Sequence, residues 1–255
     1  MTRPTPGPRA GVQSKLRDNL IVALDTPDLD VALRHVDRLG DAILWYKVGL
    51  QLFCASGRQA VLALAERGKE IFLDLKLHDI PATVERAILA LEGLPVSLLT
   101  VHASGGPKML SAAAAAARSL NVPPRVLGVT MLTSLDGTEI PALWNERTGL
   151  EEKVLGLARL GARSGIAGVV ASPLELAALR REFPRPFLIV TPGVRGPGEA
   201  THDQKRTLSL PEALAGGADY VVVGRPILEA SDAMTVIAGY EAAVIDRFST
   251  ERNDR

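Results

Sequence analysis

Residues 71–83, IFLDLKLHDIPAT, decide both the predicted fold and the predicted site. The first three residues form an apolar run typical of a strand buried on both faces, and Pro81 shows that the strand has ended. Side chains alternate along a strand, so we expect Asp74 and Lys76 to point the same way from its C-terminal end, with Asp79 on the following loop. Ionisable groups are costly to bury unless they pair or react. The segment therefore predicts an α/β enzyme whose chemistry lies at a strand end.

Seven further apolar runs of the same kind occur along the chain, and longer helical patterns separate them. They are short and rich in Val, Ile or Leu without polar alternation, as parallel strands covered on both sides are. The seven runs span residues 20–24, 43–48, 97–101, 126–130, 168–171, 187–190 and 220–223. Together with the run at residues 71–75, they predict eight strands. The predicted helices span residues 28–39, 57–67, 83–91, 107–120, 150–163, 173–181, 208–215 and about 230–248.

Eight strand–helix units in 255 residues predict a (β/α)8 TIM barrel of the α/β class, formed as a single domain. A doubly wound sheet is the alternative, but the turn after the first strand reads Asp25-Thr26-Pro27-Asp28 and lacks the glycine-rich fingerprint common there. We expect the barrel to span residues 19–250 and residues 1–18 to form a disordered tail. The long gap between the fifth and sixth strands predicts an extended loop near the active site.

Composition excludes several classes of protein. The formal net charge is zero and aromatic residues make up only 4%, so no nucleic-acid partner is expected. Cys54 is the only cysteine, which excludes an internal disulfide and suits the reducing cytoplasm, where we expect the protein. No apolar run reaches the ~18–20 residues that span a bilayer, and the tail lacks the apolar segment of a secretory signal. A transit peptide is the alternative for the tail, because no acidic residue precedes Asp18, but its prolines oppose an amphipathic helix.

Active sites of such barrels lie at the C-terminal ends of the strands. The polar residues at these predicted ends are Asp25, Lys47, Asp74, Lys76, His102, Thr133, Ser134, Ser172, the stretch Thr191 to Arg195, and Gly224-Arg225. Several have a simpler alternative interpretation: Asp25 as a turn or helix cap, His102 as a hydrogen-bonded core histidine, and Ser172 as a helix cap. No spacing of His, Cys and Asp indicates a metal site.

Lys47, Asp74, Lys76 and Asp79 are harder to explain one at a time, because they are two bases and two acids expected at one rim. Alternating charges hold one another in the charged form. A buried ion-pair network that only stabilises the fold is the alternative, but such networks often contribute little compared with an apolar core. We therefore interpret the four residues as catalytic.

Two glycine-containing segments predict a phosphate site, which TIM barrels often form with the loops after strands seven and eight and a helix N-terminus. Gly224 lets backbone N–H groups approach an anion, Arg225 adds a fork of donors, and Pro226 suits the first turn of a helix. The Gly- and Pro-rich loop after strand seven offers Arg195 and, further on, Gln204, and we interpret it as a lid over the ligand. A plain surface loop is the alternative.

Together these segments resemble the orotidine 5′-monophosphate (OMP) decarboxylase family, from about Asn19 to the last helix. The shared motifs are Leu24-Asp25, Tyr46-Lys47-Val48-Gly49, Asp74 to Pro81, Val101-His102-Ala103 with Gly105-Gly106, Leu132-Thr133-Ser134, Thr191-Pro192-Gly193-Val194-Arg195, Asp203-Gln204, and Val223-Gly224-Arg225-Pro226-Ile227. The pattern Asp-x-Lys-x-x-Asp alone is shared with related sugar-phosphate barrels. Its long form ending in His78-Asp79-Ile80-Pro81, together with Asp203-Gln204 and Gly224-Arg225-Pro226-Ile227, is highly specific to this family.

The resemblance implies a homodimer with shared active sites that converts OMP to UMP without a metal or an organic cofactor. In that scheme Lys76 donates a proton to C6 of the pyrimidine and Asp74 lies beside the departing carboxylate. Asp79 reaches the site of the neighbouring subunit, while Asp25 and Lys47 contact the ribose hydroxyls. The remaining implied contacts are Thr83 at the ribose or phosphate, Thr133 and Ser134 at the pyrimidine edge, and Arg195, Gln204, Gly224 and Arg225 at the phosphate.

Two alternatives remain beside this family. One is a Mg²⁺-dependent sugar-phosphate decarboxylase or aldolase of the same suprafamily, and the other is a catalytically silent phosphate-binding module. The clustered charges argue against the silent module, because such a protein has no need of them. The chain departs from the family pattern at Ala82, where Asn is common, and we expect this change to weaken a helix cap near the dimer contact by about 1 kcal/mol.

Overall fold

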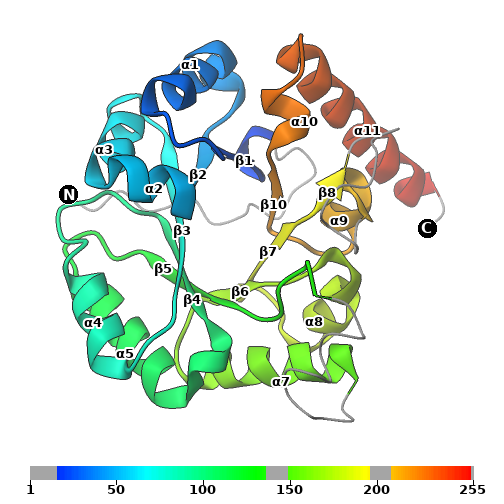
Figure 1. Cartoon of the computed structure of the whole chain (residues 1–255). Helices are drawn as coiled ribbons and strands as arrows, with labels where there is room; N and C mark the ends of the chain where they lie inside the picture. Colours follow the sequence, from blue (N-terminus) through cyan, green and yellow to red (C-terminus); the bar gives the residue numbers. More distant parts are fainter. Residues whose placement is uncertain (1–15, 136–148, 196–207, 254–255) are drawn as a thin grey trace.

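The computed structural model describes residues 16–135, 149–195 and 208–253, and the side chains of all of these except 194–195 and 250–253. Eight parallel strands close into a barrel in chain order, with the last strand pairing with the first (Figure 1). The barrel strands are β1 (Leu20–Ala23), β2 (Trp45–Gly49), β3 (Glu70–Leu77), β4 (Leu98–His102), β5 (Arg125–Val129), β6 (Gly168–Val170), β7 (Leu188–Pro192) and β10 (Tyr220–Val223). The predicted single-domain (β/α)8 barrel is confirmed, and the doubly wound alternative is wrong.

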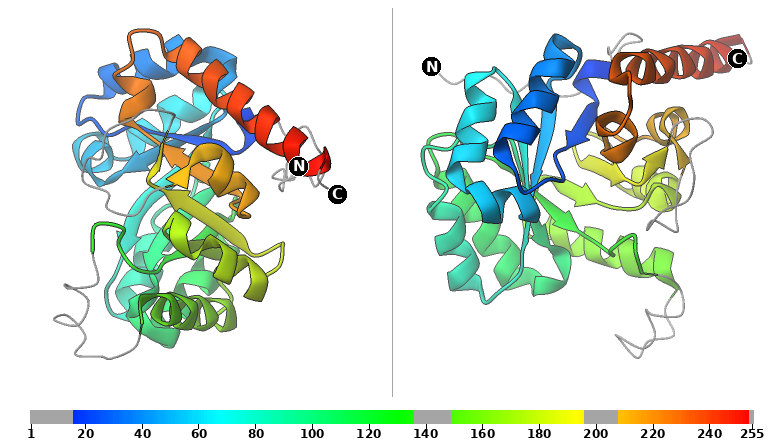
Figure 2. Two further views of the ribbon diagram at one scale, coloured as in Figure 1. Left: turned by 90° about the vertical axis from the view of Figure 1, so that its right-hand side faces the viewer. Right: turned by 45° about the horizontal axis from the view of Figure 1, so that its top comes forward.

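Helices lie on the outside of the barrel (Figures 1 and 2). They are α1 (Leu29–Leu39), α2 (Leu50–Ser56), α3 (Arg58–Glu66), α4 (Pro81–Leu89), α5 (Gly106–Ser119), α7 (Leu150–Arg163), α8 (Leu176–Glu182), α9 (Leu210–Ala215), α10 (Arg225–Leu228) and α11 (Ala233–Asn253). The short 3-10 helices are η1 (Leu16–Asp18), η2 (Gly40–Ala42), η3 (Ala103–Gly105) and η4 (Pro173–Glu175). Outside the barrel, β8 (Val194–Arg195) pairs with β9 (Leu208–Ser209). Within the described ranges, no helix is both long and apolar enough to cross a membrane.

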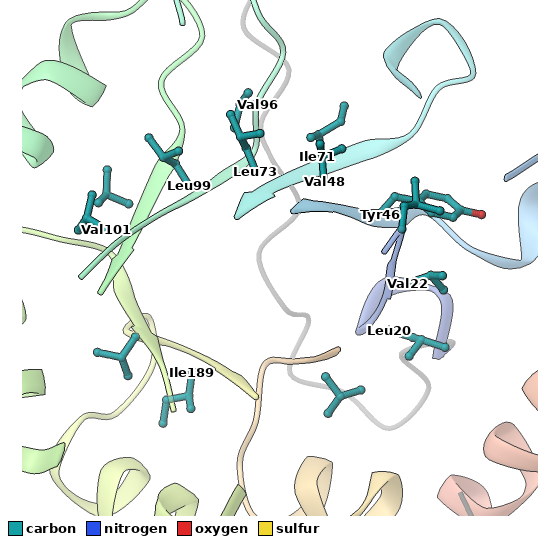
Figure 3. Close-up of a cluster of buried hydrophobic side chains, with 14 of the residues drawn as sticks. Leu20, Val22, Tyr46, Val48, Ile71, Leu73, Val96, Leu99, Val101 and Ile189 are labelled. Atoms are coloured by element: carbon teal, nitrogen blue, oxygen red, sulfur yellow. The ribbon is translucent and has the colours of Figure 1, made fainter. Parts of the chain in front are cut away.

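The strands separate two layers of apolar side chains. In β1, Leu20 and Val22 pack outward against the helices, whereas Ile21 and Ala23 belong to the layer inside the barrel. The outer layer runs around the barrel wall, and Figure 3 shows its side chains on β1, β2, β3, β4 and β7. Because both faces of each strand are buried, the strands appear in the sequence as continuous apolar runs.

The differences from the expected elements are short or lie near segment ends. The helix α2 was not predicted, because seven residues are too few for a clear helical period. The start of α10 was indicated by Pro226, although its four residues were not predicted as a separate helix. The predicted disordered tail of residues 1–18 is wrong for its last three residues. These form η1, and Leu16 is buried in the outer layer. Residues 1–15 lie outside the described residues, as do 136–148 in the predicted long loop.

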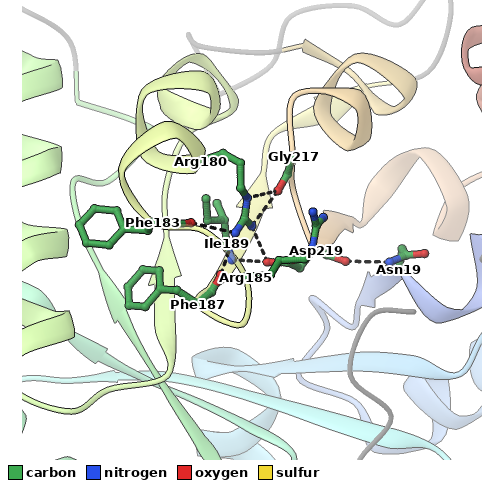
Figure 4. Close-up of polar contacts among 8 residues, drawn as sticks. All are labelled: Asn19, Arg180, Phe183, Arg185, Phe187, Ile189, Gly217 and Asp219. Carbon is green, nitrogen blue, oxygen red and sulfur yellow. Dashed lines mark hydrogen bonds and ion pairs between the residues drawn. The ribbon is translucent and has the colours of Figure 1, made fainter. Parts of the chain in front are cut away.

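A buried carboxylate ties several elements together at the N-terminal end of the barrel (Figure 4). Asp219, fully buried directly before β10, accepts a hydrogen bond from Arg180 Nη2 at 2.6 Å and one from Arg185 Nε at 2.9 Å. It also accepts the backbone N–H of Ile189 in β7 at 2.8 Å. The Asn19 side chain donates to the Asp219 carbonyl at 2.9 Å, which links β1 to the same point. This end of a TIM barrel serves stability, so we assign that role to the network.

Asp219→Asn is expected to lower the free energy of unfolding by about 3 kcal/mol, because Arg180 and Arg185 lose their shared countercharge. This is the lower end for a broken buried ion pair, since the Arg185 side chain is 48% exposed. Urea unfolding measures the effect, and the dependence of the unfolding free energy on urea concentration should stay unchanged. The control is Asp37→Asn, which breaks the exposed pair with Arg67 and should move the urea midpoint far less. Equal shifts in the two variants would contradict the assignment.

Candidate active site

A cavity of about 590 Å³ opens at the C-terminal ends of the barrel strands. Residues of β1, β2, β3, β5, β6, β7 and β10 line it. Its inner part is apolar, with Ala23, Phe72 and Val222 from the layer inside the barrel. Charged side chains from β2, β3 and the loop after β1 stand along one side. The cavity thus combines an apolar floor with a charged wall, and its size suits a small organic ligand.

Four charged residues form a chain of alternating sign in this wall. Lys47 Nζ lies 3.1 Å from Asp25 Oδ1 and 3.7 Å from Asp74 Oδ2. Lys76 Nζ lies 2.7 Å from the same Asp74 Oδ2. The side chain of Asp74 is 10% exposed and that of Asp25 is 57% exposed, so the chain runs from the solvent into the cavity. Asp74, shared by both lysines, is its central member.

The pKa of Asp74 reflects two opposing influences. Burial by itself would raise it, but the ammonium groups of Lys47 and Lys76 and the hydrogen bonds from Lys76 and Thr100 outweigh the burial. The pKa of Asp74 is therefore held below its ordinary value. Asp74 is thus a carboxylate at neutral pH, and its charge holds both ammonium groups at the cavity wall.

The end of β3 is irregular where it carries Lys76. Leu73 pairs with Leu99 of β4, but Leu77 pairs with Val101, so four residues of β3 span the length of two residues of β4. Lys76 has a φ of 50°, and among the described residues it is the one non-glycine residue with a positive φ. As expected, Asp74 and Lys76 both face the cavity, but the strand is bulged there rather than regular.

The predicted phosphate corner also lies at the cavity. Gly224 and Arg225 line it after β10, as does Gly193 after β7, and the short helix α10 begins at Arg225. Arg195 lies in β8, where it pairs with Ser209 of β9, so the two ends of the segment 196–207 are side by side. The Arg195 side chain and the whole of Gln204 lie outside the described residues, and their expected contacts stay predictions.

Comparison with known proteins decides the family. Residues 18–240 match the model of the orotidine 5′-phosphate decarboxylase / HUMPS family. The chain belongs to this family.

Among its relatives, the orotidine 5′-phosphate decarboxylase of Moorella thermoacetica is 44% identical over 238 residues, which cover 91% of this chain and 94% of that protein. The orotidine 5′-phosphate decarboxylase of Rhodopseudomonas palustris is 47% identical over 216 residues, or 85% of this chain and 89% of the relative. The crystal structure of orotidine 5′-phosphate decarboxylase from Lactobacillus acidophilus matches with a TM-score of 0.76 and 36% identity, over 91% of this chain and 99% of that one.

The cavity of a single chain gathers only part of the site that the OMP decarboxylase resemblance implies. The predicted residues that line it are Asp25, Lys47, Asp74, Lys76, Thr133, Gly224 and Arg225. Asp79, Thr83 and Ser134 are exposed and are not among the lining residues. Within one chain, Asp25 rather than Asp79 is the second acid that lines the cavity beside Asp74. The implied role of Asp79 in a neighbouring subunit is a separate matter and stays a prediction.

Two details near the cluster were not predicted or were placed wrongly. Thr100 in β4 contacts both Asp74 and Lys76 at hydrogen-bond distance. The available signal was a single hydroxyl in the otherwise apolar run 98–101.

Ala82 is the second residue of α4, whose N-cap is Ile80. The expected loss of a cap at position 82 is therefore wrong.

His102 ends β4 beside the cluster without lining the cavity. Its ring centroid lies 5.3 Å from that of His78. Burial, the neighbouring His78 and the Lys76 ammonium lower the pKa of His102 below its ordinary value, and Asp74 opposes them only in part. Folding therefore disfavours the protonated ring.

His102→Asn is expected to reduce the loss of stability between pH 7 and pH 5. The unfolded chain takes up a proton on His102 near its ordinary pKa of about 6.5, whereas the folded chain does so only at lower pH. Stability therefore falls as the pH drops through this window, and the variant removes part of that slope. His35, whose pKa is also lowered by burial, contributes to the pH dependence of stability that remains in the variant. Urea unfolding at pH 7, 6 and 5 gives the slope, and a steeper loss in the variant would contradict this account.

Proposed function

We propose that this chain decarboxylates OMP to UMP, the last step of de novo pyrimidine synthesis. The observation that carries the proposal is the Lys76 ammonium, 2.7 Å from a buried carboxylate at the wall of a cavity with an apolar floor. Its relatives with 43–47% identity are named orotidine 5′-phosphate decarboxylase, which supports the same reaction. The glycine–arginine corner at Gly224 and Arg225 suits the phosphate of such a nucleotide.

The proposed step needs a fixed positive charge near C6. The bond from C6 to the carboxylate carbon breaks, its electron pair stays on C6, and carbon dioxide leaves. Lys76 then donates a proton to C6, so the product is UMP and the lysine is left neutral until solvent returns a proton. An ammonium 4 Å from the developing carbanion contributes about 4 kcal/mol at an effective dielectric constant of 20. Enzymes lower barriers by roughly 8–23 kcal/mol, so preorganised neighbours and phosphate binding must supply the rest.

The other residues of the cavity have matching proposed roles. Asp74 holds the Lys76 ammonium in place and lies beside the substrate carboxylate. Asp25 and Lys47, paired at 3.1 Å near the cavity mouth, bind the ribose hydroxyls. The residues proposed for the pyrimidine edge are Thr133 and Ser134, and those for the phosphate are Arg195, Gln204, Gly224 and Arg225.

We further propose a cytoplasmic homodimer in which each subunit completes the site of its partner. Asp79 lies just before α4 and Thr83 in its first turn, and both are exposed and outside the cavity of their own chain. Ile80 between them is 66% exposed, and Leu89 on the same helix is 40% exposed. Exposed apolar side chains beside Asp79, an acid that does not line the cavity of its own chain, fit a surface that a second subunit covers. Cys54 is a free thiol, as suits a reducing compartment.

The sugar-phosphate alternative has less support. The family description includes HUMPS enzymes, so the family match alone does not separate the two reactions. A Mg²⁺ ion would need free carboxylates, but Asp25 and Asp74 both face the Lys47 ammonium, at 3.1 Å and 3.7 Å. Across the described ranges, no three His, Cys, Asp or Glu side chains are placed to hold a metal ion. The lysine-paired carboxylates therefore favour the metal-independent reaction.

Turnover of OMP in the presence of EDTA tests the proposed reaction. The OMP absorbance band should disappear at the same rate with and without the chelator. Lys76→Ala should lower kcat by at least about a hundredfold, because the proton donor is lost, while UMP still binds, as measured by calorimetry. Loss of wild-type activity in EDTA would favour the sugar-phosphate alternative, and a Lys76→Ala variant with wild-type kcat would refute the proton-donor role.

A mixture of two inactive variants tests the shared site. Asp79→Ala and Lys76→Ala homodimers each lack one essential group in both sites, but a hybrid dimer carries one intact site. Subunit exchange at equal concentrations should restore about a quarter of the wild-type activity, because half of the dimers are then hybrids. Mixing Lys76→Ala with the double variant Lys76→Ala/Asp79→Ala is the control and should restore none. If the first mixture also stays inactive after exchange, Asp79 does not act across subunits.

A further inference from the structure

Thr100 makes two hydrogen bonds inside the charged cluster although it lies on the neighbouring strand. It is fully buried in β4, and its Oγ1 accepts the backbone N–H of Lys76 at 2.9 Å. The same hydroxyl donates to Asp74 Oδ1 at 2.8 Å. Because a backbone N–H can only donate, the single hydroxyl proton is committed to the Asp74 carboxylate. The hydroxyl therefore donates to one central residue of the site and accepts from the other.

The bulge in β3 explains why this hydroxyl is needed. Between the pairs Leu73–Leu99 and Leu77–Val101, β3 has two more residues than β4, so the regular ladder is interrupted there. Thr100 is the single β4 residue between these pairs, and its side chain accepts the Lys76 N–H in place of a ladder carbonyl. A positive φ is unfavourable for a residue with a Cβ and persists only where its surroundings hold it. The hydrogen bond to Thr100 is such a restraint on Lys76.

The same hydroxyl also gives the two Asp74 oxygens different partners. Oδ1 accepts from Thr100, whereas Oδ2 faces the ammonium groups of Lys76 and Lys47 at 2.7 Å and 3.7 Å. A carboxylate held only by flexible lysines can rotate about its Cβ–Cγ bond and exchange its oxygens. A donor on a barrel strand prevents this rotation.

We propose that Thr100 is a positioning residue that fixes both the Asp74 carboxylate and the Lys76 backbone, and so aims the Lys76 ammonium at the reacting carbon. Thr100 is not among the residues that line the cavity, so it acts through these two neighbours rather than on the substrate. The inference rests on the proposed function where it concerns turnover. The positioning itself is a property of the free protein.

Three variants test the effect on turnover. Thr100→Val removes the hydroxyl and keeps the shape, and Thr100→Ser keeps the hydroxyl. Thr130→Val is the matched control, because Thr130 is also buried and its Oγ1 donates to the Val170 carbonyl at 3.1 Å, away from the cluster. Since hydrogen bonds to charged groups are among the stronger ones, Thr100→Val should lower kcat about ten- to a hundredfold. The KM for OMP should change little, and the other two variants should stay near the wild-type kcat.

Hydrogen exchange of the Lys76 amide, followed by NMR, tests the positioning without any turnover. Exchange of this amide should be faster in Thr100→Val than in the wild-type protein and unchanged in Thr100→Ser and Thr130→Val. A wild-type protein that does not turn over OMP would refute the proposed function, and this exchange experiment would still decide the role of Thr100.

Several results would overturn the inference. They are a wild-type kcat in Thr100→Val, an effect on KM alone, a Thr100→Ser variant as slow as Thr100→Val, and an unchanged exchange rate of the Lys76 amide in Thr100→Val. If Thr100→Val shows no cooperative urea transition, Thr100→Ala is compared with Thr130→Ala in the same two measurements, and the same outcomes decide.

Discussion

The sharing of one buried carboxylate between two lysine ammonium groups is the interaction on which the site depends. Asp74, counted as a whole residue, is 7% exposed, and such a buried position would be unfavourable for a lone charge. Lys47 and Lys76 together outweigh that cost, and the alternating chain that continues to Asp25 carries no net charge. This arrangement lets the barrel hold four charges at the wall of an otherwise apolar cavity. It also leaves an ammonium group at the surface that a ligand would contact.

The two ends of the barrel use buried aspartates in different ways. Asp219 at the N-terminal end is held by two guanidinium groups, a type of group that keeps its positive charge in proteins, and by a strand N–H. Asp74 at the C-terminal end is held by the Thr100 hydroxyl and by two lysines, a residue type that can act as a proton donor in catalysis. The cation at each end therefore suits what that end does. Arginine supplies the charge where the network only stabilises the strands, and lysine supplies a proton donor where a reaction is proposed.

The barrel was predictable because its strands are covered on both sides and therefore read as short apolar runs; β10 occupies the residues expected for it. The proximity of Asp74 and Lys76 was predictable from their spacing on one strand. The pairing of Lys47 with Asp25 was not, because it depends on how β1 and β2 are aligned in the closed barrel. The bulge of β3 and the role of Thr100 depend on the alignment with β4, which no single strand sequence reveals.

The left-handed backbone at Lys76 has a consequence for protein engineering. An Asp-x-Lys pair grafted onto a regular strand of another TIM barrel would lack the two surplus residues and the hydroxyl on the adjacent strand. The transplanted amine would then project along a different direction, even with both side chains present. The smallest transferable module is therefore a pair of neighbouring strands with their mutual offset, rather than a motif written along one of them.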